Sequence, residues 1–267
     1  SKNVISGSMF TKGEAVFVDR DHALWKAALS MLVKQMQETT DEEGASKLIV
    51  REFDSEDNAL LRKQMLDLGM IEFELPTTYV LDQMDWKDEG EYISRIGKNY
   101  RNNLRRETLD LQDRFEVKFE KNITKAEKEH CYKLYQEVQE SAMEFNVFQL
   151  PYALFESMFD DDQYDIIRLF LNDKLEQPVG VMFSYKHGNV YNALVVGLNY
   201  QFVRTENTYK QILFQTVKRA KQLECASLDL AFTAGIEKKK VGAKSKPVFA
   251  YVQATEHLSH AILHAMA

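Results

Sequence analysis

Residues 190–242 carry the pattern that most constrains the fold of this chain. They read VYNALVVGLNYQFVRTENTYKQILFQTVKRAKQLECASLDLAFTAGIEKKKVG, which predicts a strand, a polar loop, a helix, a second strand and a lysine-rich turn. Asn207 is the expected N-cap of the helix. Because the first amides of a helix and its dipole attract anions, this unit either binds an anion or is an ordinary structural unit. The helix itself is predicted by residues spaced three or four apart on one face: Tyr209, Ile212, Leu213, Thr216, Val217, Ala220 and Leu223.

Length and charge limit the classes of protein that fit. With 267 residues and 45% hydrophobic content, the chain can bury one large core or two smaller ones. Its net charge of −7 argues against a protein that coats nucleic acid or an anionic membrane with its whole surface. No apolar run reaches the ~18 residues of a membrane helix, so we expect no membrane insertion. Cys131 and Cys225 lie in apolar segments and predict reduced core residues, as in a cytoplasmic protein.

The first third of the chain alternates strands and helices. Strands are expected at residues 14–19, 47–53 and 71–81, the last interrupted at Pro76. A helix opening at Asp21 or His22 and a second one capped by Ser55 lie between them, with residues 39–46 as a loop after the first helix. This order predicts an α/β half-domain.

Residues 86–111 predict one long, basic helix. Arg95, Lys98, Arg101 and Arg105 recur at spacings of three, three and four, and Arg106 is nearby. One interpretation is a solvated face paired with neighbouring glutamates. The other is an anion clamp for a phosphate-bearing substrate, with Arg101 and Arg105 as its binding residues, because the planar guanidinium suits phosphate.

The second half of the chain predicts two helices followed by an antiparallel meander. Thr124 and Glu127 form the capping box of the first helix, and Pro151 opens the second. Strands are expected at residues 165–171, 179–185 and 190–198, joined by Asn-Asp and His-Gly-Asn turns. The helix described first then follows, with strands at residues 227–232 and 246–255 and a terminal helix at 256–266.

This order of elements resembles the GCN5-related acetyltransferase (GNAT) fold, and short motifs resemble its Fem-like acyltransferases, which include peptidoglycan aminoacyl transferases. RIGKNYRNNLRR at residues 95–106 resembles the K-x-R-x-N-L-R-R helix of that group, and VGLNY at 196–200 its G-x-D/N-x-x-Y loop. LDL at 228–230 and EKKKVGA at 237–243 resemble its D-L-G and Y-K-x-x-F-G-A ending. The glycine-rich loop of acetyl-CoA enzymes is missing, since residues 200–207 contain no glycine.

The resemblance implies direct acyl transfer from a thioester such as acetyl-CoA or another acyl-CoA, or from an aminoacyl-tRNA, to an amine acceptor. The strand at Val196 and Gly197 would pair with the pantetheine arm of the donor, and the donor phosphates would lie at the start of the following helix. The residues expected to bind this donor are Val196, Gly197, Asn199, Arg204, Thr208 and Lys210.

Three residues are candidates for catalysis. Tyr209 is either a core residue or the acid that protonates the leaving thiolate. Asp229 lies in an apolar strand, where a carboxylate needs a partner, and Lys238 is the expected one. Their pair either fixes the lysine turn or recognises the acceptor and relays a proton. No metal is expected, because Glu256, His260 and His264 share a helix face but have no supporting Cys or Asp cluster.

The sequence therefore predicts an α/β (α+β) protein of two GNAT-like halves with mixed, largely antiparallel sheets. Residues 1–86 form a degenerate half, residues 87–113 the connecting basic helix, and residues 114–267 the half that binds the acyl donor. An acyltransferase that uses acyl-CoA or a carrier thioester is the leading hypothesis. The alternatives are an aminoacyl-tRNA-dependent transferase and a non-catalytic module that binds a ligand or partner within a larger polypeptide.

Overall fold

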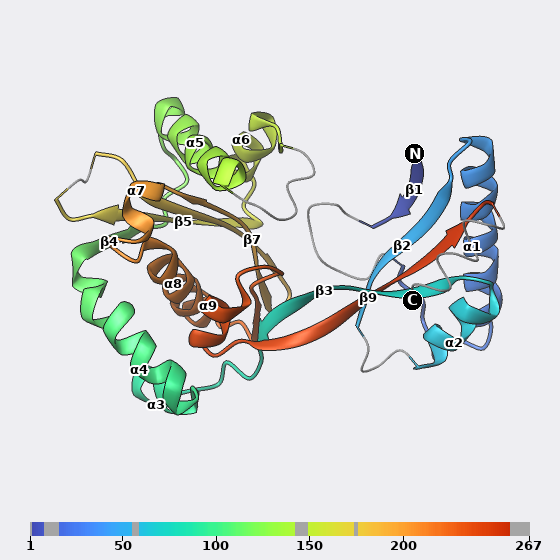
Figure 1. Ribbon diagram of the computed structural model, residues 1–267, viewed down its shortest axis with the longest axis horizontal. Helices are drawn as coiled ribbons and strands as arrows, with labels where there is room; N and C mark the ends of the chain where they lie inside the picture. The colour runs from blue at the N-terminus through green and yellow to red at the C-terminus, as the bar shows by residue number, and fades with distance from the viewer. Residues whose placement is uncertain (1, 8–15, 55–58, 142–148, 174–175, 257–267) are drawn as a thin grey trace. The chain divides into compact units, whose positions relative to one another are not determined.

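A computed structural model describes residues 2–7, 16–54, 59–141, 149–173 and 176–256 (Figure 1). The chain folds into two compact units, Ser1–Thr78 together with Lys246–Ala267, and Tyr79–Ser245. Strands β3 (Ile71–Leu81) and β9 (Lys244–Ala254) contribute residues to both units. This division differs from the predicted one. The C-terminal strand belongs to the first unit, and the basic segment 87–113 lies inside the second unit instead of connecting two halves.

The first unit is a small sheet with two helices. Its strand order is β1 (Asn3–Ser6), β2 (Lys47–Asp54), β9 and β3, with β1 parallel and β9 antiparallel to β2. The helices are α1 (Trp25–Glu42) and α2 (Ala59–Asp67). Its core contains the buried side chains of Val16, Trp25, Leu29, Val33, Leu48, Val50, Phe53, Leu61, Met65, Met70 and Tyr251.

Several details of this unit differ from the sequence-based expectations. Val16–Asp19 is not a strand, and the first two residues of that predicted strand lie outside the described residues, as does Ser55. α1 continues to Glu42, through part of the predicted loop. β3 is not interrupted at Pro76. β8 pairs only with Val80 and Leu81, so among the described residues the β8 edge of β3 has no partner strand at residue 76, and an edge of this kind tolerates proline.

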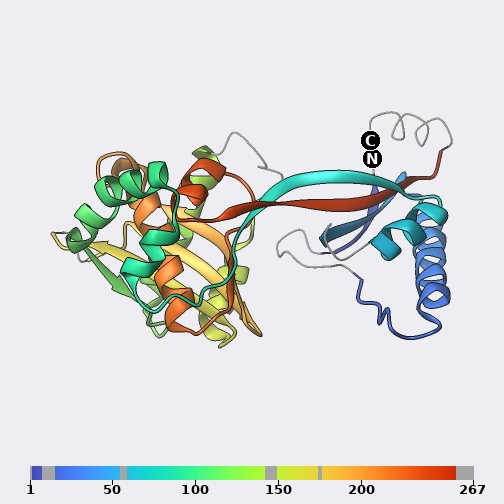
Figure 2. The ribbon, with the colours of Figure 1, turned by 90° about the horizontal axis from the view of Figure 1, so that it is seen from below.

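The second unit is built on the predicted meander. Strands β5 (Tyr164–Leu171), β6 (Gly180–His187) and β7 (Val190–Leu198) pair antiparallel in sequence order, which confirms the prediction. β4 (Phe115–Lys118) pairs antiparallel with β5, and β8 (Ser227–Asp229) lies between β7 and β3. Helices α5 (Lys125–Ser141) and α6 (Tyr152–Asp160) cover one face of this sheet, and α8 (Thr208–Gln222) covers the other (Figures 1 and 2).

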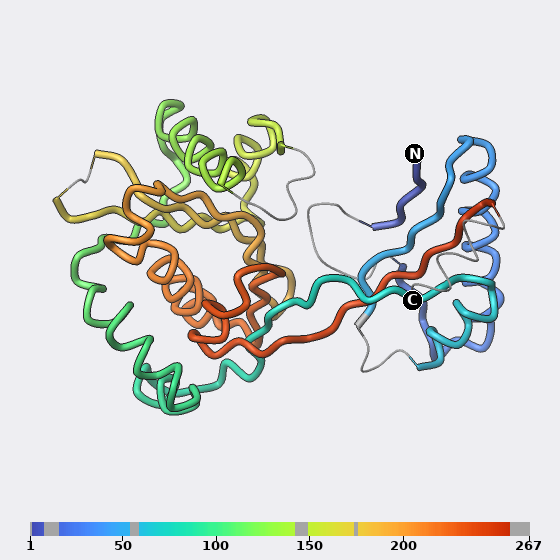
Figure 3. Tube along the Cα trace, in the orientation of Figure 1, coloured from blue at the N-terminus to red at the C-terminus, as the bar shows by residue number. Residues whose placement is uncertain are grey.

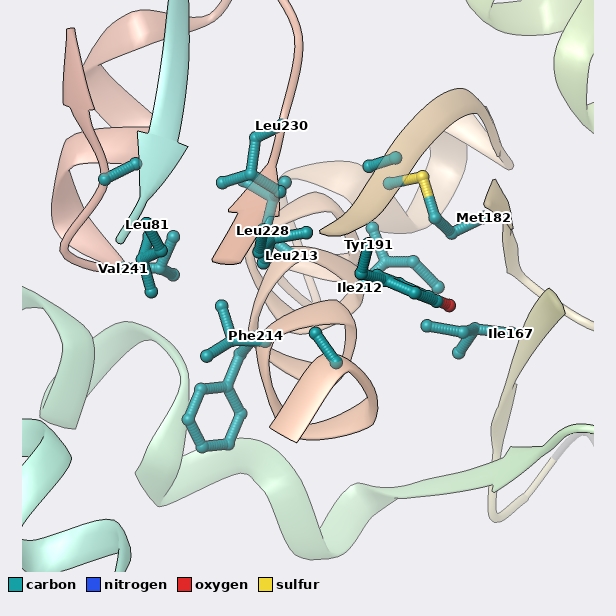
Figure 4. Close-up of a cluster of buried hydrophobic side chains, with 14 of the residues drawn as sticks. Leu81, Ile167, Met182, Tyr191, Ile212, Leu213, Phe214, Leu228, Leu230 and Val241 are labelled. Carbon is teal, nitrogen blue, oxygen red and sulfur yellow. The ribbon is translucent and has the colours of Figure 1, made fainter. Parts of the chain in front are cut away.

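α8 supplies the centre of the core of this unit. Ile212, Leu213 and Phe214 are at most 1% exposed. Figure 4 shows Leu213 beside Leu228 of β8, with Tyr191 of β7 near Ile212. Cys131 and Cys225 are buried free cysteines, as expected, and burial raises the pKa of Cys131 to about 12. The capping box is also confirmed, because the Thr124 N–H and the Glu127 N–H each donate to the other residue's side chain.

The long basic helix is not continuous. The segment forms α3 (Glu89–Arg95), α4 (Lys98–Glu107) and the short 3-10 helix η1 (Leu109–Arg114), and Figure 3 traces α3 and α4 as separate coils. The break falls at Ile96 and Gly97, whose ψ angles of 137° and 142° are extended. Ile96 is 4% exposed, so the break turns an apolar side chain into the core.

Candidate functional site

β7 and β8 lie side by side over only three residue pairs and then separate. The parallel pairing runs from Val190–Ser227 to Asn192–Asp229. Beyond Asp229 the chain follows β3 instead, because the Leu230 N–H donates to the Tyr79 carbonyl and the Tyr79 N–H donates to Ala231. The rest of β7 therefore has one edge without a partner strand among the described residues. A gap in the hydrogen bonding of a central sheet leaves main-chain groups available to a ligand.

A β-bulge coincides with this separation. Phe183 and Ser184 of β6 pair with Val195 and Ala193, so Leu194 is the extra residue of β7. The Asn199 N–H donates to the Val179 carbonyl, which sets the alternation of the ladder. By this alternation the main chain of Val195 and Gly197 faces β6, whereas the N–H and C=O of Val196 face the open edge. Val196, a predicted donor-binding residue, is thus placed where it can pair with an extended ligand.

Gly197 has a packing role that the sequence did not predict. A Cβ at this position would lie 2.7 Å from the Tyr135 amide nitrogen and 2.9 Å from the Leu134 carbonyl carbon. Both of these atoms belong to the backbone of α5, which therefore packs directly on β7. Glycine is required here for close approach of helix and strand.

The first turn of α8 lies beside the end of β7. A Cβ at Gly180 would lie 3.2 Å from Thr208 Cγ2 and 3.5 Å from Leu198 Cδ2, so the first residue of α8 and the last residue of β7 both pack there. Thr208 is fully buried, and its hydroxyl donates to the Phe202 carbonyl at 2.9 Å. The Thr208 side chain is therefore engaged within the protein, and its predicted role in donor binding stays a prediction.

Asn207 does not cap α8 in the predicted way. It adopts a left-handed conformation with φ of 54°, and its side chain accepts no helix N–H. Its Oδ1 instead accepts from Lys210 Nζ at 2.8 Å. The first helical hydrogen bond is that of Gln211 N–H to the Asn207 carbonyl. The amides of residues 208–210 are therefore left without a side-chain cap, which is the arrangement that binds anions at helix N-termini.

The two predicted cations near this terminus differ in their surroundings. Arg204 is exposed and forms no ion pair among the described residues. Lys210 is half-buried and donates to Glu107 Oε2 at 3.0 Å as well as to Asn207. Glu107 and Asn207 therefore already engage the ammonium of Lys210, and its predicted role in binding phosphate stays a prediction. Asn199 accepts from the Gln201 N–H and so caps the short helix α7 (Tyr200–Val203).

A polar cavity of about 730 Å³ lies next to α7. Its lining includes His130, Asp173, Asn199 and Gln201. The Nε2 atom of His130 lies 3.0 Å from the Pro178 carbonyl. Of the predicted donor-binding residues only Asn199 lines this cavity, so the remaining predicted residues do not define it as the donor site.

Tyr209 follows Thr208 and packs half-buried against the core. Burial, and then the negative charge of Glu237, raise the pKa of its phenol. Its hydroxyl makes no hydrogen bond to any part of the chain that the structure describes. The phenol therefore stays protonated at neutral pH and has a proton to donate, so both predicted roles, core residue and acid, are compatible with its position.

Lys238, in α9 (Gly235–Lys240), is 4% exposed and faces the turn that follows β8. Its ammonium donates to the carbonyls of Phe232 at 2.7 Å and Ala231 at 3.2 Å. Burial lowers its pKa to about 8, and the charge of Asp229 opposes this shift. Asp229 Oδ1 accepts the Ala231 N–H at 2.7 Å. Asp229 and Lys238 thus hold the same turn through its main chain.

That turn has a strained backbone. Ala231, Thr233 and Ala234 have positive φ angles of 59°, 68° and 46°, a conformation that residues with a Cβ rarely adopt. Gly235 follows them, and a Cβ there would lie 2.0 Å from the Tyr79 hydroxyl. Such strain often marks a functional segment. No local pattern predicts this strain, since none of the three strained residues is glycine or asparagine.

The cations of the basic segment divide into two groups. Arg95 is paired with Asp85 and Glu91, and Arg106 lies 3.4 Å from Glu107. By contrast, Lys98, Arg101 and Arg105 of α4 form no ion pair with any residue the structure describes. The pairing expected of a solvated face is present at Arg95, whereas anion binding by Arg101 and Arg105 stays a prediction.

Sequence reasoning missed the two acids that tie these elements together. Glu107, the last residue of α4, accepts from both Lys210 of α8 and Lys240 of α9 at Oε2. Glu237 accepts from Lys240 at 2.9 Å. The only available sequence signal was their placement, each within a run of cations.

Metal-binding clusters and membrane-spanning helices are both absent from the described residues. Within the described residues, no cluster of three His, Cys, Asp or Glu side chains is arranged to hold a metal ion. His260 and His264, which the sequence places on one helix face with Glu256, lie outside that part of the chain. None of the helices that the structure describes is both long and apolar enough to cross a membrane.

Comparison with known proteins gives a family and a fold. The sequence profile of the family described as acetyltransferase (GNAT) domain matches residues 98–238. No curated protein sequence gives a significant match.

Solved structures with the same fold include FemX, with a TM-score of 0.63 and 12% identity over 90% of this chain and 79% of that one. L-PGS from Bacillus licheniformis has a TM-score of 0.62 and 11% identity over 90% and 77%. A tandem GNAT protein from the clavulanic acid biosynthesis pathway has a TM-score of 0.51 and 12% identity over 89% and 72%. These likenesses show a GNAT-like fold for the chain.

Proposed function

Because this chain belongs to the family of GNAT acetyltransferase domains, we propose that it moves an acyl group from a CoA thioester to an amine where β7 and β8 separate. The observation that carries this proposal is the junction of two features. The open edge at Val196 leads directly to the uncapped first turn of α8. An extended arm ending in a phosphate group matches this pair of features.

Each half of the donor has a candidate partner. The main chain of Val196 offers one N–H and one C=O to the amide groups of a pantetheine arm. The amides of residues 208–210 and the exposed guanidinium of Arg204 suit the phosphates. Main-chain recognition of this kind does not need the glycine-rich loop that the sequence lacks.

The reaction requires a proton acceptor and a proton donor. A neutral amine adds to the thioester carbonyl carbon, the C–S bond breaks, the thiolate takes a proton and the new amide loses one to solvent. Tyr209 is the candidate donor to the thiolate, since its phenol is protonated and free of hydrogen bonds to the described residues. On the acceptor side, the candidates are the turn held by Asp229 and Lys238 and, for an acceptor that carries phosphate, Arg101 and Arg105.

Titration calorimetry with acetyl-CoA, longer acyl-CoAs, CoA and pantetheine tests this proposal. We expect micromolar binding of CoA and its esters, and at least tenfold weaker binding of pantetheine because it lacks the nucleotide phosphates. No binding of any CoA ester at millimolar concentration would contradict the proposal. Equal affinity for CoA and pantetheine would mean that the phosphates do not contact the first turn of α8.

An aminoacyl-tRNA donor is the second candidate. The resemblance to Fem-like acyltransferases and the three cations of α4 without ion pairs among the described residues favour it. The net charge of −7 weighs against it. Binding of a tRNA that weakens steeply as salt rises, together with no affinity for CoA esters, would support this donor instead.

A further inference from the structure

Three helices that are distant in the sequence meet at one carboxylate in the second unit. Glu107 Oε2 of α4 lies 3.0 Å from Lys210 Nζ of α8 and 3.1 Å from Lys240 Nζ of α9. The three side chains are 21%, 24% and 14% exposed, so solvent screens these pairs only in part. The hydrogen bonds outweigh the opposing effect of burial and lower the pKa of Glu107 to about 2. The carboxylate is therefore charged at any pH at which the enzyme works.

The contacts continue on both sides of Glu107. Lys210 also donates to Asn207 at 2.8 Å, and Lys240 donates to Glu237 at 2.9 Å. We call Asn207, Lys210, Glu107, Lys240 and Glu237 the Glu107 network. It runs from the residue before α8 to the acid whose charge raises the pKa of Tyr209. Its two lysines and two glutamates balance in charge, and Arg106 adds a cation 3.4 Å from the other carboxylate oxygen of Glu107.

Two consequences follow for the donor site. The network neutralises the charge of Lys210. The main-chain amides at the start of α8 and the guanidinium of Arg204 would therefore bind the donor phosphates. The network also fixes α9, which carries Lys238, against the helix turn that carries Tyr209. Glu107 thus affects both the charge of Lys210 at the donor site and the spacing between α8 and α9.

We infer that Glu107 is a positioning residue that sets donor affinity by neutralising Lys210 and holds α9 in register with the first turn of α8. This inference rests on the proposed CoA-thioester site. Glu107 is not a catalytic residue, because its two oxygens act on other side chains of the protein.

The test compares Glu107→Gln with Glu107→Asp and with Glu206→Gln as the matched control. Glu206 is an equally shielded acid just before α8, and it pairs with Arg114 at 2.7 Å without touching Lys210. In Glu107→Gln, Lys210 loses its carboxylate partner and can pair with the donor phosphates. We therefore expect the KM for acetyl-CoA to fall about threefold and to become more salt-dependent. The kcat should fall about tenfold as α9 loosens. Glu107→Asp keeps the charge and should restore the KM.

Glu206→Gln should lower the melting temperature without changing the KM for the donor. A residue with a merely structural role would behave in the same way, so an unchanged KM in Glu107→Gln overturns the inference.

Hydrogen exchange provides a readout that does not depend on the donor. We expect Glu107→Gln to accelerate exchange at residues 208–211 and 236–240 together, relative to wild type and to Glu206→Gln. Unchanged exchange at either segment overturns the positioning role. Coupled acceleration in a protein that binds no CoA ester would keep that role and contradict the proposed function instead.

Discussion

The Lys238 ammonium lies 2.7 Å from the carbonyl oxygen of Phe232, six residues earlier in the chain. With the bond to Ala231, it holds a turn whose backbone is strained at three positions. The Lys238 side chain is buried, and burial lowers its pKa to about 8. The negative charge of Asp229 opposes only part of that shift. A buried charge of this kind makes stability depend on pH.

We therefore predict that wild type gains stability relative to Lys238→Met as pH rises. Lysine in the unfolded chain titrates near 10.5, so between about pH 8 and pH 10.5 the unfolded state binds more protons than the native state. The difference in unfolding free energy between wild type and Lys238→Met should rise across this window, by up to about 3 kcal/mol. Urea denaturation at pH 7.5 and pH 10 measures it. The half-buried neighbour Lys239, replaced by Met, should show no such rise, and a flat difference for Lys238→Met would contradict the prediction.

Tyr209→Phe should lower kcat by about a hundredfold and leave the KM for the donor nearly unchanged, because it removes only the proton offered to the leaving thiolate. An aryl thioester, whose thiol is more acidic, needs no such proton, so the loss should disappear with that donor. Tyr200→Phe is the control, since Tyr200 is an exposed tyrosine in α7, the short helix that precedes α8. An equal loss with both thioesters would show that Tyr209 is a core residue only.

Arg204→Ala should raise the Kd for CoA about tenfold, because an exposed guanidinium on a phosphate contributes about 1.4 kcal/mol. Lys210→Ala should raise it less than threefold, since Glu107 already engages the ammonium. Calorimetry of the two variants decides between them. A larger effect at Lys210 would mean that this lysine leaves Glu107 when the donor binds.

Gly197→Ala should destabilise the protein by about 1–3 kcal/mol, because its Cβ would lie 2.7 Å from a backbone atom of α5. Gly97→Ala is the matched control. Its Cβ would lie 3.9 Å from the nearest neighbouring atom, so we expect a change of about 0.5 kcal/mol or less. Thermal unfolding of both variants measures the difference. A stable Gly197→Ala protein would mean that α5 can shift away from β7.

The sequence predicted the elements whose patterns are local. The meander, α8 and the capping box of α5 follow from alternation, from apolar spacing and from Thr124–Glu127, and all are present. It predicted one basic helix where there are two α-helices and a 3-10 helix, because the burial of Ile96 depends on tertiary contacts that no local pattern reveals. The sequence also placed β9 in the second half although most of it belongs to the first unit, because strand partners are not encoded in the strand itself.

Prediction of the site was correspondingly uneven. The candidate residues around α8 were chosen because the start of a helix attracts anions. The contacts that these residues make with the rest of the protein could not be predicted. Thr208 Oγ1 bonds to the main chain, and Lys210 bonds to an acid about 100 residues earlier. The pairing of Val196 with a donor was inferred from resemblance alone, and the open edge coincides with a bulge at Leu194 that leaves no trace in the composition of the strand.

Hydrogen exchange of the wild-type protein with and without saturating acetyl-CoA tests the central claim most directly. A donor that pairs with the open edge of β7 and places its phosphates on α8 should slow exchange at Val196 and at residues 208–210. Exchange at residues 180–182, which face β7 from the opposite side, should stay unchanged. Protection that leaves both Val196 and residues 208–210 unaffected would contradict this account.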